Sequence, residues 1–149
     1  MRVVEPPTPE KIEQILEQVK REIGLALSSK QEAAVYAAYR HNLSIITGSP
    51  GTGKTTVLKT ILEVYRRLHP QGEIALMAPT GRASRRMAES TGVDKAKTLH
   101  SILGLASEED EIKRNNTQEP LSADLIIVDE FSMVDMWLAN KFFSRIKGA

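Results

Sequence analysis

The segment Gly48–Thr55 constrains the fold of this chain more than any other part of the sequence. It reads Gly-Ser-Pro-Gly-Thr-Gly-Lys-Thr, which matches a pattern of one glycine, four residues and then Gly-Lys-Ser/Thr. Its glycines permit the backbone angles that turn successive N–H groups inward, where they hold a polyphosphate at the positive end of the next helix. This segment, called the phosphate loop below, therefore predicts a nucleotide-binding domain with a strand before the loop and a helix after it.

The flanking residues have the character that the phosphate loop requires. Leu43–Thr47 is a short apolar, β-branched run that predicts a buried strand, and Lys54–Leu68 has the apolar spacing of a helix. Two further apolar runs, Ile74–Ala78 and Leu125–Val128, also predict buried strands. Strands separated by helices favour a parallel sheet between two helical layers, so we expect an α/β three-layer sandwich.

Capping patterns predict further helices. Thr8 begins an amphipathic helix that Gly24 ends. Ser28 and Gln31 have the spacing of a capping box, a reciprocal pair of hydrogen bonds at the start of a helix. The remaining predicted helices are short, and they are Arg82–Ser90, Leu99–Leu103 with Thr98 as its cap, and Val134–Ile146.

Two acids, Asp129 and Glu130, end the strand Leu125–Val128. A carboxylate in this place holds Mg²⁺ directly or through water, and Glu130 would polarise an attacking water molecule. In the phosphate loop, Lys54 would reach the β- and γ-phosphates, and the Thr55 hydroxyl would ligate Mg²⁺. We therefore predict Lys54, Asp129 and Glu130 as catalytic residues, Thr55 and Asp129 as metal ligands, and ATP and Mg²⁺ as cofactors. An acidic pair alone is a weak signal, because many strands end in acids.

Ligands of parallel sheets bind at the carboxyl ends of the strands. Gly48, Pro79 and Asp129 each directly follow a predicted strand. We therefore expect these three points to lie at one edge of the sheet.

The net charge of +1 gives no global attraction to nucleic acid, but the charge is uneven. Residues 82–97 carry five basic side chains against two acidic ones, a local surplus of three, and Glu108–Glu111 is an acidic counterweight. A phosphate backbone responds to local charge rather than to the total. The alternative interpretation is a pair of solvated faces.

The sequence has no cysteine, which excludes disulfides and thiolate metal sites and fits a reducing compartment. No apolar run approaches the ~20 residues that cross a bilayer, and the polar N-terminus does not resemble a signal peptide. We expect a cytoplasmic protein that has no membrane partner.

Five segments appear in the order found in one known family, and they are Gln31, Gly48–Thr56, Ala78–Ala83, Thr98–His100 and Val128–Met133. With them, the sequence resembles the first motifs of RecD/TraA-type helicases, the exodeoxyribonuclease V alpha-subunit group of superfamily 1, from about Leu27 to Ile146. The run Asp-Glu-Phe-Ser-Met-Val-Asp is the most group-specific part, whereas the phosphate loop alone fits many unrelated ATPases. The resemblance implies a P-loop NTPase fold of RecA-like type. It also implies an ATP-driven motor that moves 5′ to 3′ on single-stranded DNA in recombination and repair.

The resemblance also implies roles for individual residues. It assigns the nucleotide to Gln31, Gly48, Ser49, Pro50, Gly51, Thr52, Gly53, Lys54, Thr55 and Thr56. Gln31 would hydrogen-bond adenine through its amide donor and acceptor, and the alternative role for Gln31 is the capping box with Ser28.

Three residues, Thr80, Gly81 and Arg82, would contact the DNA backbone, because a hydroxyl, a free N–H and a guanidinium suit phosphate. The alternative is a helix N-terminus with a solvated arginine. Thr98 and His100 resemble the family's next strand-contacting segment, in which His100 would stack on a base or contact a phosphate. The alternative for His100 is a structural histidine.

In this family a further strand, ending in a Gly-Asp…Gln segment, lies between the two strands that end at Gly48 and Asp129. The chain ends before that segment, so we expect a truncated first motor lobe: residues 1–24 as a tether and amphipathic helix, and residues 25–149 as a partial RecA-like ATP-binding domain. Such a lobe would bind ATP–Mg²⁺ but turn it over poorly without the second lobe's arginine.

The expected partners are single-stranded DNA, the remainder of the helicase chain with its second motor lobe, and other exonuclease V-type subunits. Two alternatives stay open. One is a nucleotide-binding module without turnover, and the other is a P-loop ATPase of another class, such as a loader or transport ATPase.

Overall fold

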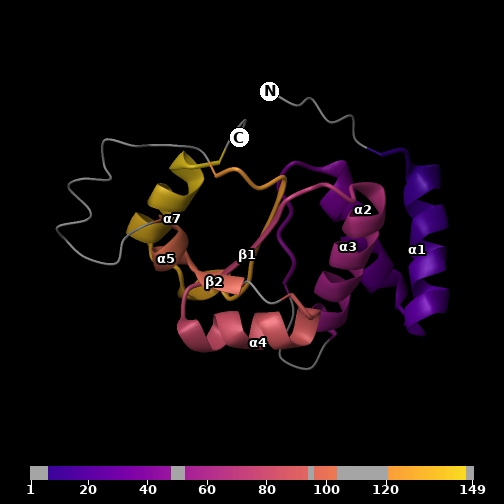
Figure 1. Ribbon diagram of the computed structural model, residues 1–149, viewed down its shortest axis with the longest axis horizontal. Helices are drawn as coiled ribbons and strands as arrows, with labels where there is room; N and C mark the ends of the chain where they lie inside the picture. The colour runs from indigo at the N-terminus through magenta and orange to yellow at the C-terminus, as the bar shows by residue number, and fades with distance from the viewer. Residues whose placement is uncertain (1–6, 48–52, 94–95, 104–120, 147–149) are drawn as a thin grey trace. The chain divides into compact units, whose positions relative to one another are not determined.

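A computed structural model describes residues 7–47, 53–93, 96–103 and 121–146 of the chain (Figure 1). The chain divides into two compact units, Met1–Gln71 and Gly72–Ala149, which are called the N-terminal unit and the C-terminal unit below. Among the described residues, no helix combines the length and the apolar character that crossing a bilayer requires.

The first helix of the N-terminal unit, α1 (Pro9–Ile23), confirms the predicted amphipathic helix. The Thr8 side chain accepts a hydrogen bond from the N–H of Lys11 at 3.3 Å, and Gly24 ends the helix in the left-handed conformation. The apolar stripe of α1 packs against α3 (Lys54–Leu68) and buries Ile12, Leu16 and Val19.

The second helix, α2 (Ser29–Arg40), begins with the predicted capping box. The Ser28 hydroxyl accepts the N–H of Gln31 at 3.2 Å, and Gln31 Oε1 accepts the N–H of Ser28 at 2.8 Å. Helix α2 packs against α3, and the Tyr39 hydroxyl donates to the backbone carbonyl of Ile61 on α3. Burial raises the pKa of Tyr39, so this phenol stays protonated and keeps the hydrogen bond.

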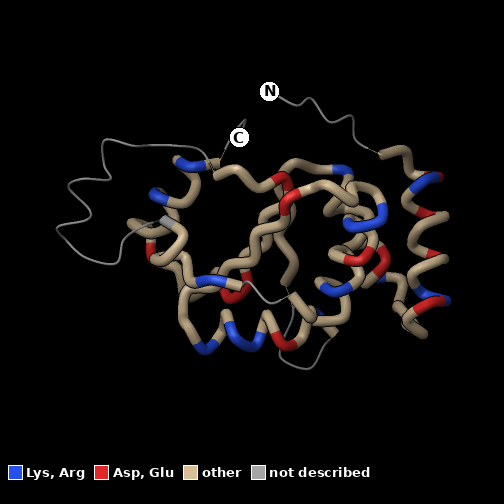
Figure 2. The backbone as a smooth tube through the Cα atoms, viewed as in Figure 1, with Lys and Arg blue, Asp and Glu red and all other residues tan. Residues whose placement is uncertain are grey.

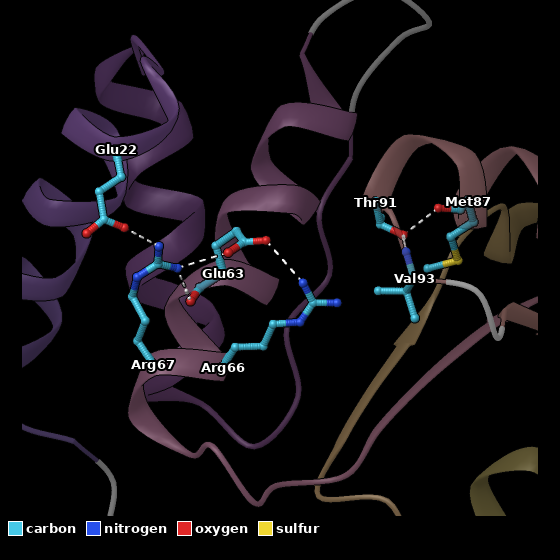
Figure 3. Close-up of polar contacts among 7 residues, drawn as sticks. All are labelled: Glu22, Glu63, Arg66, Arg67, Met87, Thr91 and Val93. Atoms are coloured by element: carbon cyan, nitrogen blue, oxygen red, sulfur yellow. Dashed lines mark hydrogen bonds and ion pairs between the residues drawn. The ribbon is translucent and has the colours of Figure 1, made fainter.

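Ion pairs join α1 to both neighbouring helices. Lys20 on α1 pairs with Glu32 on α2, and Arg67 near the end of α3 pairs with Glu22 on α1 and with Glu63 (Figure 3). The Arg67 guanidinium lowers the pKa of Glu22, and hydrogen bonding to Glu32 raises the pKa of Lys20. The charged forms of these side chains therefore favour the docked α1.

The predicted strand Leu43–Thr47 is wrong, because these residues form no regular element. Leu43 is 65% exposed and Ile45 is 83% exposed, whereas the predicted strand would have buried both residues. A strand needs a neighbouring strand to satisfy its backbone groups, and all strands in the described part of the chain belong to the C-terminal unit. The apolar, β-branched composition of this run is not sufficient by itself.

The C-terminal unit contains a three-stranded sheet in the order β2-β1-β3. Its strands are β1 (Ile74–Ala78), β2 (Ala96–Thr98) and β3 (Leu125–Val128), and both pairings are parallel. The parallel α/β architecture is confirmed, as are the predicted strands at β1 and β3. Strand β2 was not predicted, because three residues with a central lysine show no apolar pattern.

Both faces of the central strand β1 are covered. On one face, Met77 is fully buried against side chains of α5 (Leu99–Leu103) and α7 (Met136–Ser144), which are Leu99, Leu138 and Phe142. Successive strand residues point to opposite faces, so the buried Leu76 and Ala78 face the other side.

Helix α4 (Gly81–Thr91) packs along β1 and β2 (Figure 1). It buries Ala83, Ser84, Met87 and Thr91 and turns the rest of its surface to solvent. Helices with one buried stripe on a parallel sheet are the arrangement expected for an α/β domain.

The predicted helix Val134–Ile146 is shorter than expected. Residues Phe131–Met133 form a 3-10 turn, η1, and Asp135 accepts the N–H of Leu138 at 2.7 Å as the cap of α7. The carboxylate cap therefore sets the start of α7 at Met136. Leu138 and Phe142 of α7 are buried, whereas Trp137 is 47% exposed.

Candidate functional site

The phosphate loop enters α3 through Gly53. Gly48, Ser49, Pro50, Gly51 and Thr52 lie outside the described residues, so their predicted role stays a prediction. Gly53 has a φ of 82° and a ψ of 17°, a conformation open to glycine but rarely adopted by other residues. Its carbonyl accepts the N–H of Val57 at 3.1 Å, which is the first hydrogen bond of α3.

The first turn of α3 contains Lys54, Thr55 and Thr56, and its chemistry suits an anion. Among the described residues no side chain caps this end of the helix, and its first turn holds no acidic residue. The partial positive charge of the helix end is therefore not offset by these nearest side chains. Lys54 is half-buried and Thr55 is exposed, so an ammonium and a hydroxyl stand beside the backbone N–H groups that a triphosphate would approach.

Gln31 lies directly against Gly53. Its side-chain Nε2 donates to the Gly53 carbonyl at 3.4 Å, while its Oε1 accepts from the N–H of Ser28 at 2.8 Å. A side-chain carbon on Gly53 would lie 2.2 Å from Gln31 Nε2, which is closer than atoms can approach. The capping-box alternative for Gln31 is therefore confirmed, and adenine binding by Gln31 stays a prediction.

The two acids lie where β3 leaves the sheet. Asp129 still belongs to the hydrogen-bonded ladder, because its N–H donates to the Met77 carbonyl at 2.9 Å. Asp129 Oδ1 accepts the N–H of Glu130 at 2.8 Å, and Glu130 adopts a left-handed backbone with φ 55° and ψ 38°. That conformation costs about 1–2 kcal/mol for a residue other than glycine. Strained backbone of this kind recurs at functional sites, and both carboxylates are half-buried here.

The oxygen donors predicted for Mg²⁺ fit the ion chemically, because Mg²⁺ prefers hydroxyl, carboxylate, phosphate and water oxygens. In the ranges that the structure describes, no group of three histidine, aspartate or glutamate side chains could enclose a metal by itself. Thr55 belongs to the N-terminal unit and Asp129 to the C-terminal unit, so a single ion shared by both stays a prediction.

The residues predicted to contact DNA and the two acids lie at the strand ends of the C-terminal unit. Ala78 pairs with Thr98, and Met77 pairs with Val128, so the three strands end at the same edge of the sheet. That edge carries Thr80, Gly81 and Arg82 after β1, Thr98 and His100 at the end of β2, and Asp129 and Glu130 after β3. The expected meeting of Pro79 and Asp129 at one edge is confirmed, and Gly48 lies outside the described residues.

Two threonines at this edge act as helix caps. Thr80 Oγ1 accepts the N–H of Ala83 at 3.2 Å, and Thr98 Oγ1 accepts the N–H of Ser101 at 3.1 Å. Each hydroxyl keeps its own proton, which remains available to a phosphate oxygen. Gly81, Arg82 and His100 are exposed, so the cap and the predicted DNA contact are compatible.

The exposed face of α4 is basic. Arg82, Arg85 and Arg86 follow one another at helical spacing and are all exposed. Figure 2 shows that Lys and Arg recur along α4. Within the described ranges, these three arginines form no ion pair, whereas Arg66 and Arg67 of α3 both pair with glutamate (Figure 3). The sequence analysis counted Arg85 and Arg86 only within the local charge surplus and did not predict them as DNA contacts. The helical spacing of the predicted helix Arg82–Ser90 could have placed them beside Arg82.

The sequence matches known proteins over most of its length. A family model described as an AAA domain matches residues 31–149. The RecBCD enzyme subunit RecD of Haemophilus influenzae is 37% identical over 138 residues, which cover 78% of this chain and 21% of that protein. The ATP-dependent RecD2 DNA helicase of Deinococcus radiodurans is 41% identical over 108 residues, which cover 72% of this chain and 14% of that protein. The chain therefore spans about a fifth or less of the length of these relatives, and the resemblance to RecD-type helicases is confirmed.

Proposed function

We propose, from the premise that this chain belongs to the AAA domain family, that it is the ATP-binding lobe of a RecD-type DNA helicase. In this proposal the lobe binds ATP with Mg²⁺, and the complete helicase uses ATP hydrolysis to move 5′ to 3′ on single-stranded DNA in recombination and repair. Its partners would be single-stranded DNA, a second motor lobe in a longer chain and other exonuclease V-type subunits.

The start of α3 is the observation that carries the proposal. The helix begins at a left-handed glycine, has no side-chain cap from the residues that the structure describes, and presents Lys54 and Thr55 in its first turn. An uncapped helix end of this kind binds anions through its N–H groups and its dipole. The similarity to two proteins named as RecD and RecD2 supports the choice of motor over other P-loop ATPases.

Four side chains would divide the chemistry of hydrolysis. Lys54 would bind the β- and γ-phosphate oxygens, and Thr55 and Asp129 would hold Mg²⁺, which would offset charge on the phosphates. Glu130 would orient the attacking water molecule and accept its proton. The left-handed backbone of Glu130 turns the chain out of the sheet directly after Asp129, so the two acids need not share one direction.

Turnover by these 149 residues alone should be slow. In the family that the chain resembles, an arginine of the second motor lobe stabilises the charge of the transition state. Arginines in this role are worth roughly 10³–10⁵ in rate. We therefore propose that the chain binds ATP–Mg²⁺ without efficient turnover until the rest of the motor is present.

A binding experiment with a fluorescent ATP analogue and Mg²⁺ tests the nucleotide part of the proposal. Lys54→Ala should weaken binding by roughly tenfold to a hundredfold, because a charge-assisted hydrogen bond to phosphate is lost. Lys59→Ala is the matched control, since Lys59 lies about 1.4 turns further along the same helix and its replacement should leave the affinity unchanged. Equal affinities of the wild type and Lys54→Ala would contradict the proposal.

The DNA part is tested by fluorescence anisotropy with a labelled single-stranded oligonucleotide at several salt concentrations. Arg82→Ala should weaken binding and reduce the slope of log affinity against log salt by roughly 0.7, which is the loss of one phosphate contact. Arg66→Ala is the control, because Arg66 is already paired with Glu63. If ATP binding stands but Arg82→Ala changes neither affinity nor slope, a P-loop ATPase of another class becomes the better reading.

A further inference from the structure

The Gln31 side chain spans the space between the start of α2 and the start of α3. Both ends of its amide are engaged, Oε1 with the N–H of Ser28 and Nε2 with the carbonyl of Gly53. The amide nitrogen occupies the volume where any residue other than glycine would carry its first side-chain carbon. Gln31 and Gly53 are 22 positions apart, so this contact is part of the tertiary structure rather than a local turn.

The Gln31 amide contacts the Gly53 carbonyl, which is the backbone group at the start of α3. The Gly53 carbonyl accepts the first hydrogen bond of that helix, from Val57, and Lys54 follows Gly53 directly. A hydrogen bond to this carbonyl therefore restrains the peptide plane from which the first N–H groups of α3 project.

We propose that Gln31 is a positioning residue for the phosphate-binding start of α3, and that it acts on the triphosphate through Gly53. This inference rests on the proposed function, because it concerns the same nucleotide. It goes beyond recognition of a base, since a ligand with phosphates and no base should also depend on Gln31.

The positioning role leaves room for a base. A glutamine amide has two N–H donors and two acceptor lone pairs, and one of each is used here. One donor and one acceptor remain, which is the pair that the edge of adenine requires. Gln31 can therefore contact a base and the Gly53 carbonyl at the same time, and the two contacts would support each other.

Titration calorimetry with Mg²⁺–tripolyphosphate, which has no base, tests this inference. Gln31→Met keeps the approximate length of the side chain but removes its donor and acceptor. It should weaken tripolyphosphate binding about threefold to tenfold, the usual effect of one hydrogen bond. ATP binding should weaken by at least the same factor.

Two control variants separate positioning from general destabilisation. Gln14→Met makes the same change on the exposed side of α1 and should leave tripolyphosphate affinity unchanged. Ser28→Ala removes the hydroxyl half of the capping box but keeps the Gln31 amide, so it should lower the melting temperature while tripolyphosphate affinity stays within about twofold.

Each contrary result identifies what has failed. If Gln31→Met weakens ATP but not tripolyphosphate, Gln31 serves only the base, and the positioning role is overturned while the proposed function stands. If Ser28→Ala weakens tripolyphosphate as much as Gln31→Met, the effect comes from the stability of α2, and the inference is again wrong. If the folded wild-type chain binds neither ligand, the nucleotide site itself is refuted.

Discussion

At Glu130, the proposed chemistry favours an acidic side chain, whereas the backbone conformation favours glycine. A carboxylate at the end of β3 suits a water molecule that must lose a proton, but the left-handed backbone suits glycine. Glu130 is the one residue other than glycine with a positive φ among those that the structure describes. The protein is therefore less stable with glutamate at this position than it would be with glycine, and the proposed chemistry explains why an acid is present.

Replacing Glu130 by glycine should stabilise the protein. Relief of the left-handed strain should outweigh the extra freedom of glycine in the unfolded chain, giving a net gain of up to about 1 kcal/mol in the free energy of unfolding. Urea unfolding monitored by circular dichroism measures this change. Glu130→Gln is the control, because it neutralises the acid without relieving the backbone and should leave stability near that of the wild type. A Glu130→Gly variant that is less stable than Glu130→Gln would contradict the strain argument.

Individual site residues differ in how far the sequence could predict them. Lys54, Asp129 and Glu130 stand in short patterns whose chemistry is local, so they could be proposed without a structure. The backbone angle of Glu130 could not, since glutamate carries no signal for the left-handed region. The contact of Gln31 with Gly53 also could not, because it depends on how α2 and α3 pack.

At the scale of a helix, α1 shows how charge and apolar burial act together. Ile12, Leu16 and Val19 provide the buried stripe, while Lys20 and Glu22 form ion pairs with the neighbouring helices. The burial gives most of the attachment energy, because exposed ion pairs are individually weak. The ion pairs make the attachment sensitive to pH and salt.

The α1 ion pair predicts a loss of stability in acid. The pKa of Glu22 is lowered by Arg67 from its ordinary value of 4.5, so its contribution is complete above pH 4.5 and is lost as the pH falls through the lowered value. The melting temperature should therefore fall on acidification, and Glu22→Gln should make that fall smaller. Circular dichroism melts at a series of pH values from 7 down to 3 measure both.

The control for the acid experiment is Glu13→Gln, another exposed position on α1. Glu13 forms none of the ion pairs that the structure records, so its replacement should leave the acid sensitivity as it is in the wild type. An equal effect of both substitutions would mean that overall charge, rather than the Glu22–Arg67 pair, governs the response.

Secondary-structure elements were predictable where local pattern and burial agree. Helix α1 has a side-chain cap and a terminal glycine at its ends, both α1 and α3 have apolar stripes, and β1 and β3 are apolar runs inside a sheet. Leu43–Thr47 is apolar like β1 and β3, but the described residues of the N-terminal unit contain no strand with which it could pair. Strand β2 has one partner but no apolar pattern, so its pairing with β1 defines it. Pairing, which sequence periodicity does not encode, explains both errors.

At the scale of the whole molecule, the proposed function requires one ligand to be held by residues of both units. Lys54 and Thr55 belong to the N-terminal unit, and Asp129 and Glu130 belong to the C-terminal unit. A ligand that binds only the folded state stabilises it by about 2.7 kcal/mol at a hundred times its dissociation constant. A shared ATP–Mg²⁺ should therefore protect both units against unfolding.

The single tryptophan of the sequence makes this testable. Trp137 lies on α7, so its fluorescence reports unfolding of the C-terminal unit, while circular dichroism reports all helices. Saturating ATP–Mg²⁺ should raise the melting temperature by both measurements in the wild type. In Asp129→Ala, the rise measured by Trp137 should be lost or much reduced. A wild-type protein in which ATP–Mg²⁺ shifts the dichroism but never the fluorescence would show that the C-terminal unit takes no part in binding.

Helix α3 links two features at opposite ends of the same element. Its 15 residues make it about 22 Å long, with Gly53 and Lys54 at one end and the Arg67–Glu22 pair at the other. Because α3 is one continuous helix that packs against α1, we expect a tilt of its first turn to shift α1 as well. A spectroscopic probe on the outer surface of α1 would then act as a remote reporter. It would sense whether a ligand occupies the Gly53 end of α3 without touching that ligand.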